Sequence, residues 1–99
     1  MYEVRKTGQF KKDLKLCNKR DYDLSLLLVA MQSLEEAGTL PEKYNPHKLT
    51  GKSDKDETWD GHIQPDWILL WRVEKNDDKK YEGIIVFVRT GTHSDLFKK

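Results

Sequence analysis

The side chains in this 99-residue chain that are best suited to chemistry are its three histidines, two aspartates close to one of them, and one arginine. Histidine can act as an acid or a base near neutrality, because its unperturbed pKa is about 6.5. Arginine binds phosphate through paired hydrogen bonds. The combination predicts a site for proton transfer and anion binding. Its members are His47, Asp60, His62, Asp66, Arg89 and His93.

Two predicted strands would bring most of this set together. Residues 67–74 and 81–89 are rich in apolar and β-branched side chains, and the polar segment 75–80 between them has the composition of a hairpin turn. The two strands should therefore be antiparallel neighbours, with the start of the first and the end of the second at the same end of the sheet. We expect His62 and Asp66 to lie close to Arg89 and His93.

Other chemistries fit the sequence less well. Three histidines and an aspartate could hold zinc or manganese, but no HExxH motif is present and the cationic Arg89 would oppose a divalent ion. Cys17 falls on the apolar stripe of a predicted helix, so we expect a buried small hydrophobe rather than a nucleophile. The chain also lacks the glycine-rich loops that bind nucleoside triphosphates and dinucleotides. We predict a site without metal or cofactor.

The predicted element order is β-α-α-β-β-β, an α+β fold. Residues 2–6 alternate as a strand, residues 9–19 form an amphipathic helix, and residues 21–37 form a leucine-rich helix with Asp21 as N-cap and Gly38 as stop. The width of the second apolar stripe suggests a central helix packed on more than one side. Strands follow at 57–63, 67–74 and 81–89. The two helices should cover one face of a small, mostly antiparallel twisted sheet and leave the other face and the strand ends free.

Length and composition indicate one globular domain over residues 1–99. A content of 36% hydrophobic and 35% charged residues argues against both a disordered chain and a membrane protein. The formal net charge of +1 conceals a basic segment, because residues 1–20 carry seven positive and two negative side chains. One cysteine, no apolar run long enough to span a bilayer and no apolar leader predict a cytoplasmic protein.

Three motifs then resemble one family along the whole chain. They are Tyr44-Asn-Pro-His47-Lys-Leu49-Thr-Gly51, Asp60-Gly-His62-Ile-Gln-Pro-Asp66-Trp67 and Arg89-Thr-Gly91-Thr-His93-Ser-Asp-Leu96-Phe97. Their order and spacing are similar to those of the YafQ branch of the RelE/ParE toxin superfamily. The resemblance implies the toxin of a bacterial type II toxin–antitoxin system, a ribosome-dependent and metal-independent endoribonuclease that cuts mRNA in the A site.

The resemblance also implies roles for single residues. Arg89 would bind the phosphate, His93 would be the general acid, and either His47 or Asp66 the general base, with His62 positioning the phosphate or a neighbouring nucleotide. Trp67 and Phe97 would lie at the substrate, and Lys48 and Lys52 would add positive charge near it. The basic helix face with Lys11, Lys12 and Lys15 is the predicted ribosome-docking surface.

The implied partners are a cognate antitoxin, the 70S ribosome with its RNA, and mRNA. The free toxin is expected to be a monomer and its antitoxin complex a hetero-oligomer. Two other functions remain open from the sequence. One is a ParE-like inhibitor that acts on DNA gyrase by contact alone, and the other is a catalytically inactive co-repressor.

Overall fold

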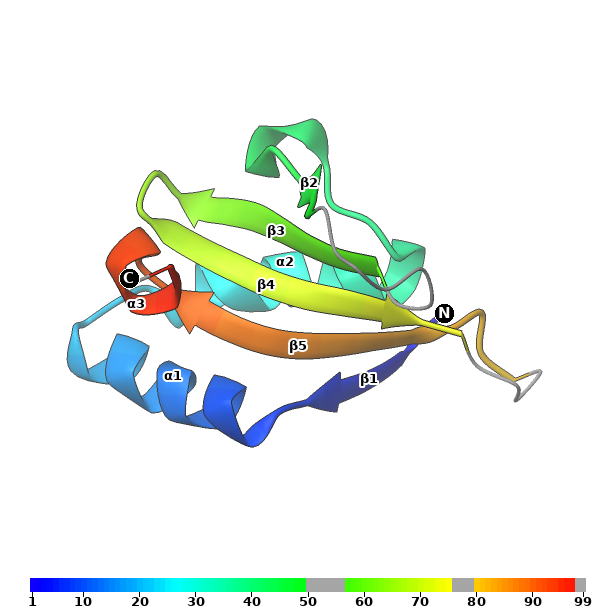
Figure 1. Cartoon of the computed structure of the whole chain (residues 1–99), viewed down its shortest axis with the longest axis horizontal. Coiled ribbons are helices and arrows are strands. Elements are labelled where there is room, and N and C mark those ends of the chain that lie inside the picture. Colours follow the sequence, from blue (N-terminus) through cyan, green and yellow to red (C-terminus); the bar gives the residue numbers. More distant parts are fainter. Residues whose placement is uncertain (50–56, 76–79, 98–99) are drawn as a thin grey trace.

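The computed structural model describes residues 1–49, 57–75 and 80–97. A five-stranded sheet has the order β1-β5-β4-β3-β2, with β1 (Glu3–Lys6) parallel to β5 (Ile84–Gly91). The other strands are antiparallel to their neighbours: β2 (His47–Lys48), β3 (Glu57–Gln64) and β4 (Trp67–Glu74). Figure 1 shows helix α2 behind this sheet and helix α1 beside β1 and β5. The predicted α+β fold and the antiparallel pairing of the last two strands are confirmed.

Helix α1 (Gly8–Lys19) begins where Thr7 caps it, because the Thr7 hydroxyl accepts the N–H of Phe10 at 2.9 Å. Phe10 and Cys17, seven residues apart, are buried on its inner face. Burial raises the pKa of the Cys17 thiol. Cys17 is thus the buried small hydrophobe that was predicted.

Helix α2 (Leu24–Ala37) begins later than predicted. Its N-cap is Asp23, whose carboxylate accepts the N–H of Ser25 at 3.0 Å. Asp21, the predicted cap, instead has φ +59° in the reversal between the two helices, a conformation that aspartate tolerates better than most residues. Gly38 ends the helix in the left-handed conformation, as predicted.

The core lies between the helices and one face of the sheet. Leu27 and Leu34 of α2 pack there with Trp71 of β4 and Phe87 of β5. The prediction that α2 packs on more than one side is wrong, since Leu28 and its neighbour Val29 remain 61% and 57% exposed. Helix α2 therefore packs against the core with one apolar stripe only.

The face of the sheet that was predicted to be free of helices also carries buried apolar residues. Ile68 and Leu70 on β4 and Ile84 and Val86 on β5 lie outside the helix-covered core and are still buried. Polar side chains share this face at the end of the sheet where β5 finishes.

Three short elements are absent from the predicted order, although the sequence motifs contain all the residues of two of them. They are the 3-10 helix η1 (Glu42–Tyr44), strand β2 and helix α3 (His93–Leu96). Helix α3 follows β5 directly and lies at the end of the sheet where β3 turns into β4 (Figure 1). Two of these elements carry histidines of the predicted site, His47 and His93.

Candidate active site

A row of paired residues crosses four strands on the face of the sheet opposite α2. His47 pairs with Asp60, Asp60 with Leu70, and Leu70 with Arg89. Directly opposed residues in neighbouring strands point to the same face, so the imidazole, the carboxylate and the guanidinium share it. His62 lies two residues beyond Asp60 on β3 and belongs to the same face.

Between these residues, Gly61 points toward the helix-covered core. A Cβ atom at this position would lie 2.9 Å from a Leu40 methyl group and 3.1 Å from the Trp71 ring. The Asp60-Gly61-His62 motif therefore combines two polar side chains on one face with the close packing on the other face that only glycine allows.

His93 is held by Asp66. One carboxylate oxygen, Oδ1 of Asp66, accepts the backbone N–H of His93 at 3.0 Å and lies 2.6 Å from the Nδ1 ring nitrogen. These two hydrogen bonds, the backbone bond first, lower the pKa of Asp66 below its usual value. An ionised carboxylate requires the ring proton on Nδ1. The free Nε2 atom of His93 is then the atom that can exchange a proton with a ligand.

Two other rings surround His93. The His62 ring centroid is 5.5 Å from that of His93, and the Phe97 centroid is 6.3 Å away. Phe97 is 46% exposed at the end of α3. The predicted neighbourhood of His62, Asp66 and His93 is therefore present, with an exposed aromatic ring at its border.

An open cleft of about 810 Å³ runs between α1 and α3 and contains both Arg89 and His93. Helix α1 contributes the residues of one face to it, since positions 9, 12, 13 and 16 follow helical spacing. The cleft is lined by Gln9, Lys12, Asp13, Leu16, Arg89, His93, Ser94, Asp95 and Phe97.

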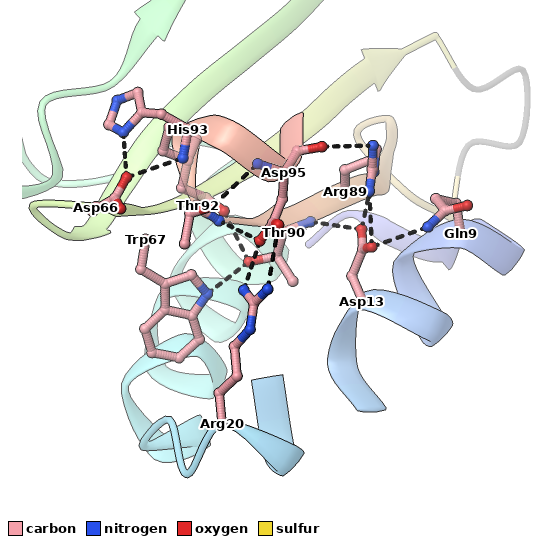
Figure 2. A network of polar contacts seen from close by, with 11 residues as sticks. Gln9, Asp13, Arg20, Asp66, Trp67, Arg89, Thr90, Thr92, His93 and Asp95 are labelled. Carbon is pink, nitrogen blue, oxygen red and sulfur yellow. Dashed lines mark hydrogen bonds and ion pairs between the residues drawn. The ribbon is translucent and has the colours of Figure 1, made fainter. Parts of the chain in front are cut away.

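Arg89 has a partner that the sequence analysis did not include. Its Nε and Nη2 atoms donate to the two carboxylate oxygens of Asp13, each at 3.1 Å, and Nη1 donates to the backbone oxygen of Asp95 at 3.3 Å (Figure 2). The bond to Asp13 raises the pKa of Arg89. Asp13 is the one acidic residue of α1, and its position among lysines was the available signal.

A second ion pair ties α3 to the end of α1. Arg20 donates to Oδ2 of Asp95 at 2.7 Å, and Asp95 also accepts the backbone N–H of Thr92 in a capping box at the start of α3. Arg20 first, and then the Thr92 N–H, lowers the pKa of Asp95 to about 2. Figure 2 shows this pair beside the Asp66 and His93 pair, so the helix that carries His93 is anchored at both ends of its first turn.

The remaining predicted site residues are spread more widely. His47 Nδ1 is 3.6 Å from Oδ1 of Asp60, and Lys48 forms an exposed ion pair with Glu57 at 3.4 Å. Trp67 is only 1% exposed, because its indole N–H donates to Thr90 inside the core. The structure thus places Trp67 beneath the site, without access to a substrate. Lys52 lies outside the described residues.

The predicted ribosome-docking lysines fall on two faces of α1. Lys12 lines the cleft with Arg89 and His93, whereas Lys11 and Lys15 do not. All three side chains are exposed. The basic helix therefore presents one lysine to the site and the others to the surroundings.

Within the described residues, the structure offers neither a cluster of metal ligands nor a membrane-spanning helix. No group of three or more His, Cys, Asp or Glu side chains in these ranges could hold a metal ion. Within the same ranges, no helix is long and apolar enough to cross a membrane.

Nearly the whole chain matches one protein family. Residues 2–98 match the model of the bacterial toxin of type II toxin–antitoxin systems, YafQ. The chain belongs to the YafQ toxin family. The mRNA interferase toxin YafQ of Escherichia coli K12 is 36% identical over 100 residues, which cover 96% of this chain and 95% of that protein. The family and fold predicted from the sequence are confirmed.

Two solved toxin structures share the fold of this chain. The E. coli DinJ–YafQ complex matches with a TM-score of 0.79 and 35% identity, covering 98% of this chain and 99% of that one. A metal-bound toxin from Helicobacter pylori matches with a TM-score of 0.74 and 35% identity, covering 98% and 100%. The YafQ fold therefore extends over nearly the whole chain.

Proposed function

We propose that this YafQ family member is an mRNA interferase, an endoribonuclease that cleaves mRNA in the A site of the ribosome. Two histidine–aspartate contacts carry the proposal. His93 and Asp66 meet at the end of the sheet, and His47 and Asp60 lie on the sheet face that also holds Arg89. The relatives named mRNA interferase toxin support the same reaction class.

The reaction needs three groups. A base removes the proton of the 2′-OH, whose oxygen then attacks the adjacent phosphorus. A cation stabilises the charge that develops on the phosphoryl oxygens, and an acid protonates the departing 5′-oxygen. A 2′,3′-cyclic phosphate and a 5′-OH end result. The chain supplies a group for each of these tasks from its own side chains.

The geometry supports an assignment for each group. His93 is the acid. Its Nδ1 atom is bound to Asp66, so its Nε2 atom is the ring nitrogen that can give a proton to the departing oxygen. Arg89 binds the phosphate in the cleft that it shares with His93. Asp66 is a positioning residue, since its carboxylate is already committed to His93. His47 is left as the base, with Asp60 as its partner.

His62 lies between the two pairs. It is two residues from Asp60 along β3, and its ring is 5.5 Å from that of His93. It can donate to a phosphoryl oxygen between acid and base. Phe97, exposed beside His93, offers a surface on which a base can stack.

The partners follow from the same proposal. Lys11 and Lys15 on the outer face of α1 dock against ribosomal RNA, and Lys48 and Lys52 add charge toward the mRNA. A cognate antitoxin inhibits the toxin. The crystal structure of the E. coli DinJ–YafQ toxin–antitoxin complex supports this partner. The toxin acts in the cytoplasm as a monomer and joins its antitoxin in a hetero-oligomer.

Purified toxin tests the proposal when it is added to programmed ribosomes and to the same mRNA alone, followed by mapping of the RNA ends. Cleavage confined to the A-site codon of ribosome-bound mRNA is expected. Equal cleavage of free mRNA would contradict the ribosome-dependent part, and intact mRNA in both reactions would contradict the enzyme.

A further inference from the structure

The buried carboxylate of Asp13 has a role that the proposed mechanism does not use. Asp13 is 5% exposed, although it lies in a helix with exposed lysines at positions 11, 12 and 15. Burial of a carboxylate is costly unless hydrogen bonds replace its water. Here four donors do so, namely Gln9 Nε2, Arg89 Nε, Arg89 Nη2 and the backbone N–H of Thr90, each at 3.1 Å.

The contact fixes one edge of the Arg89 guanidinium. Nε and Nη2 donate in parallel to the two oxygens of Asp13, and one N–H of Nη1 goes to the Asp95 backbone oxygen. A guanidinium has five N–H groups. Within the described contacts, one N–H on Nη1 and one on Nη2 are still available. The free Nη2 hydrogen lies on the edge between Nη1 and Nη2, which the Asp13 bonds do not occupy.

The backbone bond ties this arrangement to the strand. Oδ2 of Asp13 accepts both Arg89 Nε and the N–H of Thr90, the next residue of β5. The guanidinium plane is thereby set relative to the strand that leads into α3 and His93. Without such a partner, the arginine would have to adopt one orientation during the reaction, and the cleavage rate would fall.

We propose that Asp13 is a positioning residue for the reaction, which holds Arg89 so that its free N–H groups meet the scissile phosphate. The inference rests on the proposed function, in which Arg89 binds that phosphate. A carboxylate that only fastened α1 to β5 would need the Thr90 bond alone. The bidentate geometry toward Arg89 is the additional feature that the positioning role explains.

Asp13→Asn separates the two roles, because the asparagine oxygen still accepts the Thr90 N–H. The neutral amide, however, binds Arg89 Nε more weakly than a carboxylate does and turns a donor toward Arg89 Nη2. The Asp13→Asn variant is compared with wild type, Arg89→Gln and the double variant in single-turnover cleavage of mRNA on programmed ribosomes. Asp23→Ala, which removes the α2 N-cap and does not line the cleft, controls for reduced folding stability. Exchange of the Arg89 Nε–H with water, followed by ¹⁵N NMR, reports the contact without any cleavage.

The proposal predicts that Asp13→Asn slows cleavage by about tenfold to a hundredfold, speeds Arg89 Nε–H exchange, and has no further effect in the Arg89→Gln background. An unchanged rate, or the same fold-loss in both backgrounds, would overturn the positioning role. If wild-type protein fails to cleave, the proposed function fails instead. Slow Nε–H exchange that depends on Asp13 would then still support the positioning of Arg89, and exchange independent of Asp13 would refute it.

Discussion

A single oxygen of Asp66 accepts both the backbone N–H and the ring Nδ1 of His93, at 3.0 and 2.6 Å. The backbone N–H belongs to the first turn of α3, where N–H groups have no partner inside the helix. Asp66 therefore satisfies the start of the helix and orients the imidazole with the same atom. The catalytic assignment of His93 depends on this double contact.

Asp66→Ala should slow mRNA cleavage by about tenfold to a hundredfold, because the His93 ring loses its fixed orientation. The side chain is 67% exposed, so the thermal unfolding midpoint should change little. Single-turnover cleavage and a thermal melt measure the two effects. A variant with the wild-type cleavage rate would exclude Asp66 as the positioning residue.

His47 and His62 should differ in how strongly their loss slows cleavage. A general base contributes about a hundredfold to ten-thousandfold to a rate, so His47→Ala should reduce the single-turnover rate by that order. His62→Ala removes one hydrogen-bond donor to the phosphate and should cost less. A smaller loss in His47→Ala than in His62→Ala would transfer the role of base to another group.

Lys12 and Lys11 form a matched pair on neighbouring positions of α1, one inside the cleft and one outside. Lys12→Ala should lower the maximal single-turnover rate severalfold, because the lysine is placed to contact the bound RNA. Lys11→Ala should raise the ribosome concentration needed for half-maximal rate and leave the maximum unchanged. A titration of toxin with ribosomes at two salt concentrations measures both quantities.

Charge reversal at Glu36 on α2 is the control for the lysine variants. It changes the net charge of an exposed helix position that does not line the cleft. Equal effects of Lys11→Ala and Lys12→Ala on the maximal rate would show that the two faces of α1 do not have separate tasks.

Asp95 should contribute to folding stability in a pH-dependent way. Its pKa is lowered to about 2 in the folded protein, against about 3.9 for an unfolded aspartate. The stabilisation is therefore present above about pH 4 and is lost as the pH falls toward 2. Asp95→Asn should lower the free energy of unfolding by about 1 kcal/mol at pH 7, an amount reduced by solvent screening.

Urea unfolding at pH 7 and at decreasing pH measures this contribution. The difference between wild type and Asp95→Asn should shrink with acidification, and Arg20→Gln should show a similar loss at pH 7. A difference that stays constant between pH 5 and pH 3 would mean that the ionised carboxylate does not stabilise the fold.

The sequence predicted the parts of the site that lie on regular strands or directly beside them. Apolar composition located Trp67–Glu74 with its observed bounds, and the predicted antiparallel pairing brought Asp66 close to His93. It did not predict the burial of Trp67, since the indole side chain has both an apolar body and a polar N–H that suits a core contact. Nor did it identify Asp13, because a lone acid in a basic helix has the same pattern whether it faces solvent or an arginine 76 positions later.

The catalytic role of His93 is tested most directly by cleavage of mRNA on programmed ribosomes by wild-type protein and by His93→Gln, with binding to the cognate antitoxin measured alongside. We expect A-site cleavage by wild type, loss of cleavage in His93→Gln and equal antitoxin binding by both. Cleavage by His93→Gln at the wild-type rate would contradict the assignment of this site as the catalytic centre.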